Sequence, residues 1–385
     1  MATDTNGNLW AETQGILGAH AYVASLPRVA SGDLARLMLS LSGADFSGRA
    51  AVVSTCSRLE IYAAEALEQL DGISYFRRLR GIDAVEHLAA VAAGADSIVA
   101  GETDVFAQVR GAFASTTGAL RQLGDIVIAA GREARTRVAS APRDAGRQLD
   151  LALALAGGDL PGSVCIVGTG AMARHLAKRA RELGIGRIVV SGRHTRRAEG
   201  LASELGVASV PSAMLPGAAE AGCLVLAFKG VPSETFQRSI VDAARRSSLV
   251  VDLTMPRFAW PDAPAPNVVD LEMLAGRSEE PPDDRGLREE LRAAAVSAVR
   301  RRCQHALGEG PAVAVDLYRH IERIRVQEVL RTQTSCEEDR EFADRLTKAL
   351  IRKLFHAYGN ALRIGHDPSL IETTRRFFLE SGSQV

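Results

Sequence analysis

A cysteine flanked by hydroxyl groups and a cation follows a short apolar run near the start of the chain. The run AAVV at 50–53 leads, through a serine, into Thr55-Cys56-Ser57-Arg58. A nearby cation and hydroxyl donors favour an ionised sulfur, and the thiolate is the nucleophilic form of cysteine. A single cysteine after a strand is more often a small buried apolar residue. Cys56 is therefore either a nucleophile or a packing residue.

A second polar stretch, GADSIVAGETDVFAQVR at 94–110, interrupts a largely apolar pattern. Ser97, Glu102 and Gln108 offer a hydroxyl, a carboxylate and an amide to a small zwitterionic substrate. Helix capping and surface polarity account for the same residue types equally well. His87 lies in the apolar helical pattern AVEHLAAVAAG, where a lone histidine is usually a packing residue, although imidazole groups also move protons near neutral pH.

A glycine-rich turn lies between an apolar strand pattern, VCIV, and a helical pattern. In such a turn the first glycine permits the bend, the second lets the backbone approach a pyrophosphate, and a small third residue allows close helix–strand packing. The first N–H groups of the helix then face the phosphates. We therefore expect a dinucleotide-binding loop formed by Gly168, Thr169, Gly170, Ala171, Met172 and Ala173.

The end of the next predicted strand indicates which dinucleotide binds. An NAD site usually has a carboxylate about 20 residues after the glycines. This chain has no carboxylate there, and instead has Ser191, Arg193, Arg196 and Arg197. Guanidinium groups suit the 2′-phosphate of NADP, so the pattern predicts NADPH as the cofactor. A solvated basic helix start would have the same composition.

Apolar strands alternate with amphipathic helices from residue 164 to residue 254, which is typical of a parallel sheet covered on both faces. Before this region, residues 15–115 mix helices with short apolar strands, namely GILGAHAYVA, RAAVVST and LEIYAAE. Residues 118–157 have a continuous helical pattern with several arginines on one face. After it, the proline and charge content of 277–286 predicts a loop. A helical pattern begins at Leu287 and is expected to break at GEGP, 308–311.

The expected fold class is therefore α/β and multidomain. We expect an N-terminal α+β catalytic domain at 1–150, a Rossmann-like NADPH-binding domain at 151–276 and an all-helical region at 277–385. The long amphipathic helices of the last region cannot bury their apolar faces alone. The pattern therefore predicts that they pair with a second copy of the chain.

Charge and cysteine content exclude several classes of protein. Lys+Arg and Asp+Glu are each 46, so a polyanionic partner would have to meet a local basic patch. The five cysteines include no CxxC pair or Cys/His cluster, which argues against disulfides and structural metal, and for a reducing compartment. The first fifteen residues lack a secretory pattern, and no apolar run approaches about 18 residues. We expect a soluble, cytoplasmic protein that makes no membrane contact.

Three motifs together resemble the glutamyl-tRNA reductase family. STCSRLEIY at 54–62 is similar to the family motif S-T-C-N-R-x-E-[ILV]-Y. The run GADS…GE…QVR at 94–110 is similar to G-x-D-S…G-E…Q-V-[KR], and DLTMPR at 252–257 is similar to D-[IL]-[AS]-[VM]-P-R. The glycine-rich loop and the helical C-terminus also match, so the likeness spans nearly the whole chain.

The resemblance implies an activity and an assembly. The activity is the NADPH-dependent reduction of the glutamyl group of Glu-tRNA to glutamate-1-semialdehyde through a thioester on Cys56, which opens tetrapyrrole synthesis. The assembly is a V-shaped homodimer with a long spinal helix and no metal or flavin, and its aldehyde can pass to the aminomutase that follows. His87 would be the assisting histidine. The residues that would surround the glutamyl group are Thr55, Ser57, Arg58, Ser97, Glu102, Thr103, Asp104 and Gln108.

Two other functions stay open. The family asparagine after the cysteine is Ser57 here, and the cation that follows His20 in the family is missing. These differences favour a related thioester-forming reductase that acts on another aminoacyl-tRNA or acyl thioester. A non-catalytic tRNA-binding dimer fits less well, because Cys56 and the nucleotide loop are both kept. Candidate tracks for tRNA phosphates are the Arg-rich stretch 132–147 and the arginines at 300–302, although solvated faces would have the same composition.

Overall fold

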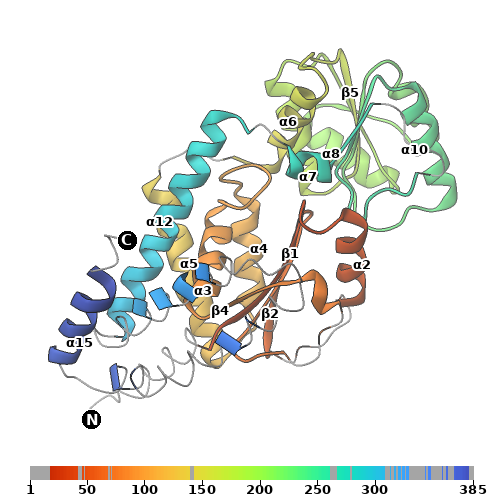
Figure 1. The fold of residues 1–385 in the computed structure, drawn as a ribbon. Helices are drawn as coiled ribbons and strands as arrows, with labels where there is room; N and C mark the ends of the chain where they lie inside the picture. The colour runs from red at the N-terminus through yellow and green to blue at the C-terminus, as the bar shows by residue number, and fades with distance from the viewer. Residues whose placement is uncertain are drawn as a thin grey trace, which may run out of the picture.

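The chain folds into an N-terminal lobe (residues 18–147) and a parallel-sheet lobe (residues 148–277), with a long helix packed along the first (Figure 1). The computed structural model describes residues 18–307, apart from 42–45, 47, 68–69, 71, 139–142, 261–266 and 278–279. Beyond residue 307 it describes 368–380 and single residues between 313 and 362. The helix break predicted at GEGP, 308–311, lies outside the described residues.

An antiparallel sheet with strand order β2-β3-β1-β4 forms the centre of the N-terminal lobe. Its strands are β1 His20–Ser25, β2 Ala50–Ser54, β3 Arg58–Ala63 and β4 Arg77–Arg80. Successive residues of a strand face opposite sides. Ala21 and Val23 accordingly join the core formed with helices α3 to α5, whereas Tyr22 and Ala24 join the core that includes helix α2. The sequence predicted β1, β2 and β3 and missed the charged strand β4.

The helices of the N-terminal lobe cover both faces of this sheet. They are α2 Ser31–Leu41, η1 Ile73–Tyr75, α3 Ile82–Ala93, α4 Asp104–Phe113 and α5 Gly118–Arg137. The continuous helix predicted over 118–157 is wrong. Helix α5 ends at Arg137, and a short turn of 3-10 helix, η2 Ala145–Arg147, precedes α6 Gln148–Leu155. Asp144 is the N-cap of η2. Its backbone is extended, and its carboxylate accepts a hydrogen bond from Gly146 N at 2.9 Å.

A six-stranded parallel sheet with order β10-β9-β8-β5-β6-β7 forms the second lobe, as predicted. Helices α7 and α8 pack on one face and α10 on the other. Strand β5 lies between β6 and β8, so the strand order reverses there, and ligands of such sheets bind at this point. The strands are β5 Ser163–Val167, β6 Arg187–Ser191, β7 Ala208–Ser209, β8 Cys223–Leu226, β9 Leu249–Asp252 and β10 Val268–Asp270. The helices are α7 Ala171–Glu182, α8 Thr195–Leu205, η3 Ser212–Met214, α9 Leu215–Ala218, α10 Glu234–Arg246 and α11 Leu271–Gly276.

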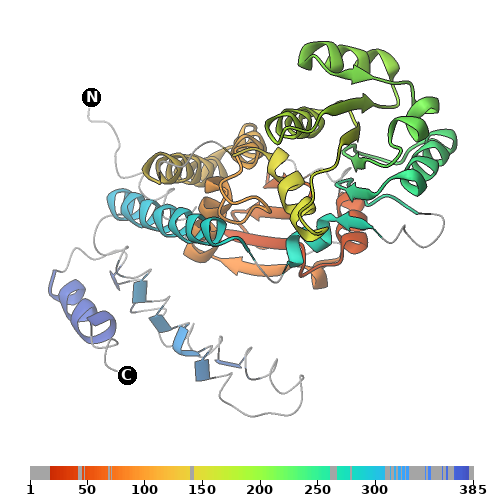
Figure 2. The same cartoon turned by 90° about the horizontal axis from the view of Figure 1, so that it is seen from above.

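Helix α12 Pro282–Leu307 runs alongside α5 and α3 of the N-terminal lobe (Figures 1 and 2). Leu287, Leu291 and Ala295 carry its apolar side into the core of that lobe. The loop predicted over 277–286 is wrong for its second half, because the helix already begins at Pro282. A proline is well tolerated in the first turn of a helix, where its missing N–H is not needed.

The described residues of the C-terminal region are helical. They include α15 Pro368–Thr374 and a π-helical turn, η4 Arg375–Glu380. Val313, Leu317, Ile321, Leu362 and Ile371 form a small apolar cluster of their own. Pairing of this region with a second copy stays a prediction. Within the described part of the chain, no helix is both long and apolar enough to cross a membrane.

Candidate active site

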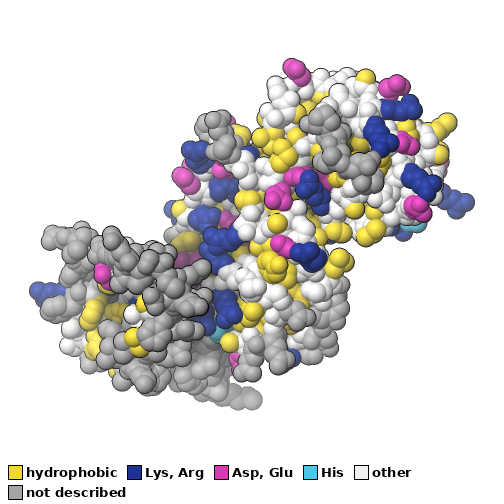
Figure 3. Space-filling model, turned by 45° about the vertical axis from the view of Figure 1, so that its right-hand side comes forward, with side chains coloured by type: hydrophobic (Ala, Val, Ile, Leu, Met, Phe, Trp, Pro, Cys, Tyr) yellow, Lys and Arg dark blue, Asp and Glu magenta, His cyan; other side chains and the backbone are white. Residues whose placement is uncertain are grey.

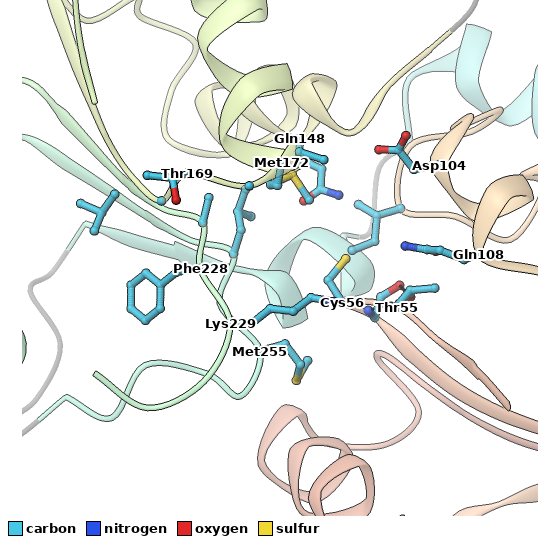
Figure 4. A pocket seen from close by; sticks show the side chains of 18 of the residues that line it. Thr55, Cys56, Asp104, Gln108, Gln148, Thr169, Met172, Phe228, Lys229 and Met255 are labelled. Carbon is cyan, nitrogen blue, oxygen red and sulfur yellow. Dashed lines mark hydrogen bonds between the residues drawn. The ribbon is translucent and has the colours of Figure 1, made fainter. Parts of the chain in front are cut away.

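A cavity of about 560 Å³ lies between the two lobes, and we call it the interlobe cavity (Figure 4). One side comes from the turn between β2 and β3 and from the segment 97–108. The other side comes from the loops at the carboxyl ends of β5, β6 and β8. Of the residues expected from the sequence, its wall contains Thr55, Cys56, Ser57, Arg58, Ser97, Glu102, Asp104, Gln108, Gly168, Thr169, Gly170, Ala171, Met172, Arg193 and Arg197.

The turn between β2 and β3 places Cys56 on the cavity wall. Thr55 N donates to Arg58 O at 3.0 Å, which closes the turn, and Ser57 N donates to Thr55 Oγ1 at 3.2 Å. Leu26 N donates to Ser57 O at 3.0 Å and ties the turn to the end of β1. Cys56 is half-buried and faces the cavity, so it is not sealed in the apolar core.

The sulfur of Cys56 is not held ionised by its neighbours, contrary to the expectation from the sequence. Burial raises the pKa of the Cys56 thiol to about 12, and the nearby Glu102 carboxylate adds to this effect. The Gln148 amide faces the sulfur and lowers the pKa, and Arg58 lowers it more weakly. Nucleophilic attack by this thiol therefore needs a group that accepts its proton.

Arg58 has a small effect because its guanidinium is engaged behind the turn. Arg58 Nη1 donates to Glu60 Oε1 at 3.0 Å, and its Nη2 donates to the backbone carbonyl of Asp96. Tyr62 Oη donates to Glu60 Oε2 at 2.5 Å. Burial alone would raise the pKa of Glu60, but His87 and Arg58 lower it to about 2. The cation thus pairs with a permanently ionised carboxylate rather than with the sulfur.

His87 belongs to this buried network and does not line the interlobe cavity. Its Nε2 lies 3.2 Å from Glu60 Oε1, and its Nδ1 lies 3.5 Å from Asp96 Oδ2. Both ring nitrogens thus face carboxylates, and the side chain is 10 % exposed. His87 therefore does not line the cavity in this structure, and its part as the assisting histidine stays a prediction. The histidine supports Glu60 and Arg58, and through them the turn that carries Cys56.

Glu102 is held at the cavity wall by a fixed loop. Arg135 Nη1 donates to Glu102 O at 3.0 Å and Arg135 Nη2 donates to Gly101 O at 3.1 Å. Gly94 makes the close approach that the loop needs, since a Cβ there would lie 3.0 Å from the Gly101 and Glu102 backbone. Burial and the Asp104 carboxylate raise the pKa of Glu102 to about 7. Glu102 can therefore both accept and donate a proton near neutral pH.

Helix α12 also holds the wall that contains Ser97. Arg288 Nη1 donates to Ser97 O at 2.9 Å and to Ala95 O, and its guanidinium pairs with Glu280 at 2.7 Å. Arg292 pairs with the carboxylate of Asp96. Three successive residues of the segment 95–97 are thus bonded to one face of a helix that begins almost 200 residues later in the chain.

The nucleotide side of the cavity has the close contacts that a dinucleotide loop needs. Gly168 has φ +153°, and a Cβ there would lie 2.1 Å from Ala227 O, so only glycine fits. Gly170 has open space where a Cβ would be, and α7 begins at the next residue. The helix N-terminus faces the cavity, as binding of a pyrophosphate requires. Ala173 is fully buried beneath the loop, where it allows close packing but does not reach the cavity.

The basic stretch after β6 is split between the cavity and the surface. Arg193 and Arg197 line the cavity, whereas Arg196 is exposed and lies off its wall. Ser191 also lies off the wall, because its side chain is fully buried and its hydroxyl has no partner among the described residues. Thr103 is likewise off the wall, and its backbone N donates to Arg143 O at 2.9 Å. The cavity thus keeps two of the four polar groups predicted to select NADP.

The wall residues that sequence reasoning missed include Gln148, Lys229 and Met255. Figure 4 shows the Lys229 side chain directed across the cavity toward Cys56. Lys229 and Met255 follow β8 and β9, and the rule that ligands bind beyond the carboxyl ends of parallel strands could have found both. Gln148 could not be found this way, because its stretch looked like the middle of a long helix. Among the described residues, no group of three His, Cys, Asp or Glu side chains could hold a metal ion.

The arginines at 300–302, considered for tRNA phosphates, already have acidic partners. Arg300 donates to Glu86 at 3.1 Å, and Arg301 and Arg302 both pair with Glu133. The stretch 132–147 is not one helix, so its arginines do not share a face. On the side of the parallel-sheet lobe shown in Figure 3, Lys and Arg side chains are interspersed with Asp and Glu. These arginines are thus not assigned to a phosphate track.

Two family models match separate parts of the chain. Residues 19–138 match the model described as glutamyl-tRNAGlu reductase, N-terminal domain. Residues 163–256 match the model described as NADP oxidoreductase, coenzyme F420-dependent. The boundary between the matches falls between α5 and β5, where the chain passes from one lobe to the other. The second match agrees with a lobe that binds a nicotinamide dinucleotide.

Individual relatives carry the same name as the first model. The chain is 30% identical to the glutamyl-tRNA reductase of Thermus thermophilus over 283 residues, which cover 68% of this chain and 70% of that protein. It is 29% identical to that of Corynebacterium urealyticum over an alignment of 387 positions, covering 84% and 76%. A solved structure of glutamyl-tRNA reductase from Methanopyrus kandleri aligns over 95% of this chain and 99% of that one, with 21% identity and a TM-score of 0.35. By its sequence, this chain belongs to the glutamyl-tRNA reductase family.

Proposed function

We propose that this protein reduces the glutamyl group of Glu-tRNA to glutamate-1-semialdehyde with NADPH, the first step of tetrapyrrole synthesis from glutamate. The observation that carries the proposal is that a cysteine thiol and a dinucleotide loop line one cavity. An ester accepts hydride poorly, and a covalent thioester divides the reduction into two easier steps. Membership of the family and its named relatives support the substrate.

In the first step, the Cys56 sulfur forms a bond to the carbonyl carbon of the glutamyl ester. The thiol proton passes to Glu102, whose pKa of about 7 leaves much of it ionised at neutral pH. The ester C–O bond then breaks, and Glu102 returns the proton to the departing 3′ oxygen of the tRNA. Thiol and ester become thioester and alcohol, so no oxidant or reductant is needed.

The second step needs a reductant in the same cavity. Bound NADPH would supply the hydride that, together with one proton, converts the thioester into the aldehyde and the free thiol. The loop from Gly168 to Met172 would hold its pyrophosphate. Arg193 and Arg197 would hold its 2′-phosphate, which favours NADPH over NADH.

Side chains of the N-terminal lobe would bind the glutamyl group. Ser97, Asp104 and Gln108 face the cavity from the segment 97–108, and Thr55 faces it from the turn that carries Cys56. Arg58 would support this site indirectly, because its guanidinium already pairs with Glu60. We further propose a homodimer formed by the C-terminal helices, and transfer of the reactive aldehyde to the aminomutase that consumes it.

The proposal is tested by trapping the thioester. The full chain is incubated with radiolabelled Glu-tRNA without NADPH, and protein-bound label is measured after denaturation. Label is expected on the native protein and on Cys303→Ala, whose thiol is buried in α12, and not on Cys56→Ser. Absence of label from the native protein would refute the proposal. Label from a different aminoacyl-tRNA only would identify the chain as a related reductase with another substrate.

A further inference from the structure

Gln148 is the first residue of α6 and has a fully buried side chain with unsatisfied polar atoms. Neither Nε2 nor Oε1 has a hydrogen-bond partner among the described residues. Burying an amide without partners costs free energy, so a buried side-chain amide is nearly always bonded to protein, water or ligand. Gln148 therefore lacks a partner that offers both an acceptor and a donor.

The unsatisfied amide lies where the two sides of the interlobe cavity meet. Figure 4 shows Gln148 beside Met172 of the nucleotide loop, with its amide directed toward Cys56. A nicotinamide ring that delivers hydride to an acyl group on Cys56 has to lie within reach of both Cys56 and Gln148. Its carboxamide carries one carbonyl acceptor and one NH2 donor, which complement the amide of Gln148.

The backbone around Gln148 is fixed to the nucleotide-binding side. Asp144 pairs with His175 of α7 at 2.8 Å, and Asp150 pairs with Arg179 of α7 at 2.8 Å. A Cβ on Gly146 would lie 2.5 Å from His175 O, so the segment packs directly against α7. Gln148 is thus held in place relative to the helix that begins at the dinucleotide loop. This arrangement suits a contact with the cofactor better than a contact with the acyl substrate.

We infer that Gln148 binds the carboxamide of the nicotinamide ring and thereby determines how the ring lies against Cys56. The inference rests on the proposed function, because it assumes a nicotinamide cofactor in this cavity. Gln148 is then a specificity-determining residue for the cofactor's reactive end, separate from the arginines that select its 2′-phosphate. A role on the sulfur alone would use only Nε2 and would leave Oε1 unsatisfied.

The test compares two cofactors in a binding assay without tRNA. The full chain is titrated with NADPH and with its reduced 3-acetylpyridine analogue, in which a methyl group replaces the amide NH2. The native protein should prefer NADPH by about 5- to 150-fold, the effect of leaving one buried polar group unpaired. In Gln148→Leu and Gln148→Met the preference should fall below about twofold, because the amide that distinguishes the two ligands is gone.

A matched substitution controls for general effects of removing an amide. Gln122→Leu removes another partly buried amide with an unpaired oxygen, on α5 and off the cavity wall. This variant should keep the native preference. A Gln148 variant that binds NADPH and still prefers it would overturn the inference. The inference would also be overturned if the preference were unchanged and alkylation of Cys56 became slower. Gln148 would then act on the Cys56 sulfur.

Failure of the inference is distinguishable from failure of the proposed function. A native protein that forms the labelled thioester and binds both cofactors equally well overturns the inference alone. A native protein that binds neither cofactor overturns the inference and the cofactor assignment together.

Discussion

The imidazole of His175 in α7 contacts the carboxylate of Asp144, with His175 Nδ1 2.8 Å from Asp144 Oδ2. On its other side, His175 Nε2 lies 3.3 Å from Asp104 Oδ2, at the start of α4. One side chain of the parallel-sheet lobe is therefore bonded to two separate segments of the N-terminal lobe. Since Asp104 also lines the interlobe cavity, this contact fixes the relative position of its two sides.

Replacing His175 should loosen the contact between the lobes. In His175→Ala, hydrogen exchange of the backbone at 144–150 should become faster, and the free energy of unfolding should fall by about 1 kcal/mol. The effect is small because the three side chains are partly exposed to solvent. Arg238→Ala breaks a fully solvated pair on α10 and should change neither quantity. Unchanged exchange at 144–150 in His175→Ala would contradict the prediction.

Glu102→Gln should change two properties of Cys56 in opposite directions. The Glu102 carboxylate raises the pKa of the thiol, so its removal should lower that pKa from about 12 and speed alkylation by iodoacetamide at a given alkaline pH. Acyl transfer from Glu-tRNA should slow by about 100- to 10,000-fold, because the proton acceptor is lost. In the native protein, the rate of thioester formation should rise with pH up to about 7, where Glu102 ionises, and then level off.

Both measurements use the same protein samples and report on different groups. Alkylation is followed by mass spectrometry of Cys56, and acyl transfer by protein-bound label. If Glu102→Gln kept the native pH profile for thioester formation, another group would be the proton acceptor.

The two glycines of the nucleotide loop should respond differently to alanine. Gly168→Ala places a Cβ against Ala227 O at positive φ, and should lower the free energy of unfolding by about 2–4 kcal/mol. Gly170→Ala meets open space and has an extended backbone, so stability should stay the same. NADPH binding should still weaken in Gly170→Ala, since the methyl group occupies the approach of the pyrophosphate. Chemical denaturation and calorimetric titration measure the two effects, and equal stability losses would refute the distinction.

Arg193 and Arg197 should determine the preference for NADPH over NADH. Replacing either with alanine should lower the ratio of the two affinities by about 10- to 100-fold, since each loses a charge-assisted hydrogen bond to the 2′-phosphate. Arg196→Ala should keep the native ratio, because Arg196 lies off the cavity wall. Affinities are measured by titration of the full chain with each dinucleotide. A loss of preference in Arg196→Ala alone would assign the phosphate to the exposed surface instead.

Local patterns predicted much of this architecture. The parallel sheet followed from strands that alternate with helices, and the loop at Gly168 followed from glycine spacing, because both patterns can be read from consecutive residues. The two strands on either side of Cys56 were also expected. The electrostatics of the sulfur were not, since they depend on which way Arg58 turns. Its partner at Asp96 is 38 residues away, and no local pattern reveals that contact.

The errors in the predicted helices have a similar origin. The stretch 118–157 has helical composition throughout, but Asp144 starts a new helix by binding Gly146 N, a choice that packing against α7 favours. That break is what brings Gln148 to the cavity. His87 was placed at the site by the family resemblance, and the structure shows the carboxylates of Glu60 and Asp96 beside its two ring nitrogens.

The bonds from Arg288 and Arg292 to the segment 95–97 have a mechanical consequence. Helix α12 continues toward the C-terminal region, so a rotation or shift applied at its far end would be transmitted along a rigid rod to the backbone beside Ser97. The position of the segment 95–97 therefore depends on the position of α12. A partner that binds the C-terminal region could thus shift the cavity wall beside Ser97 without contacting the cavity.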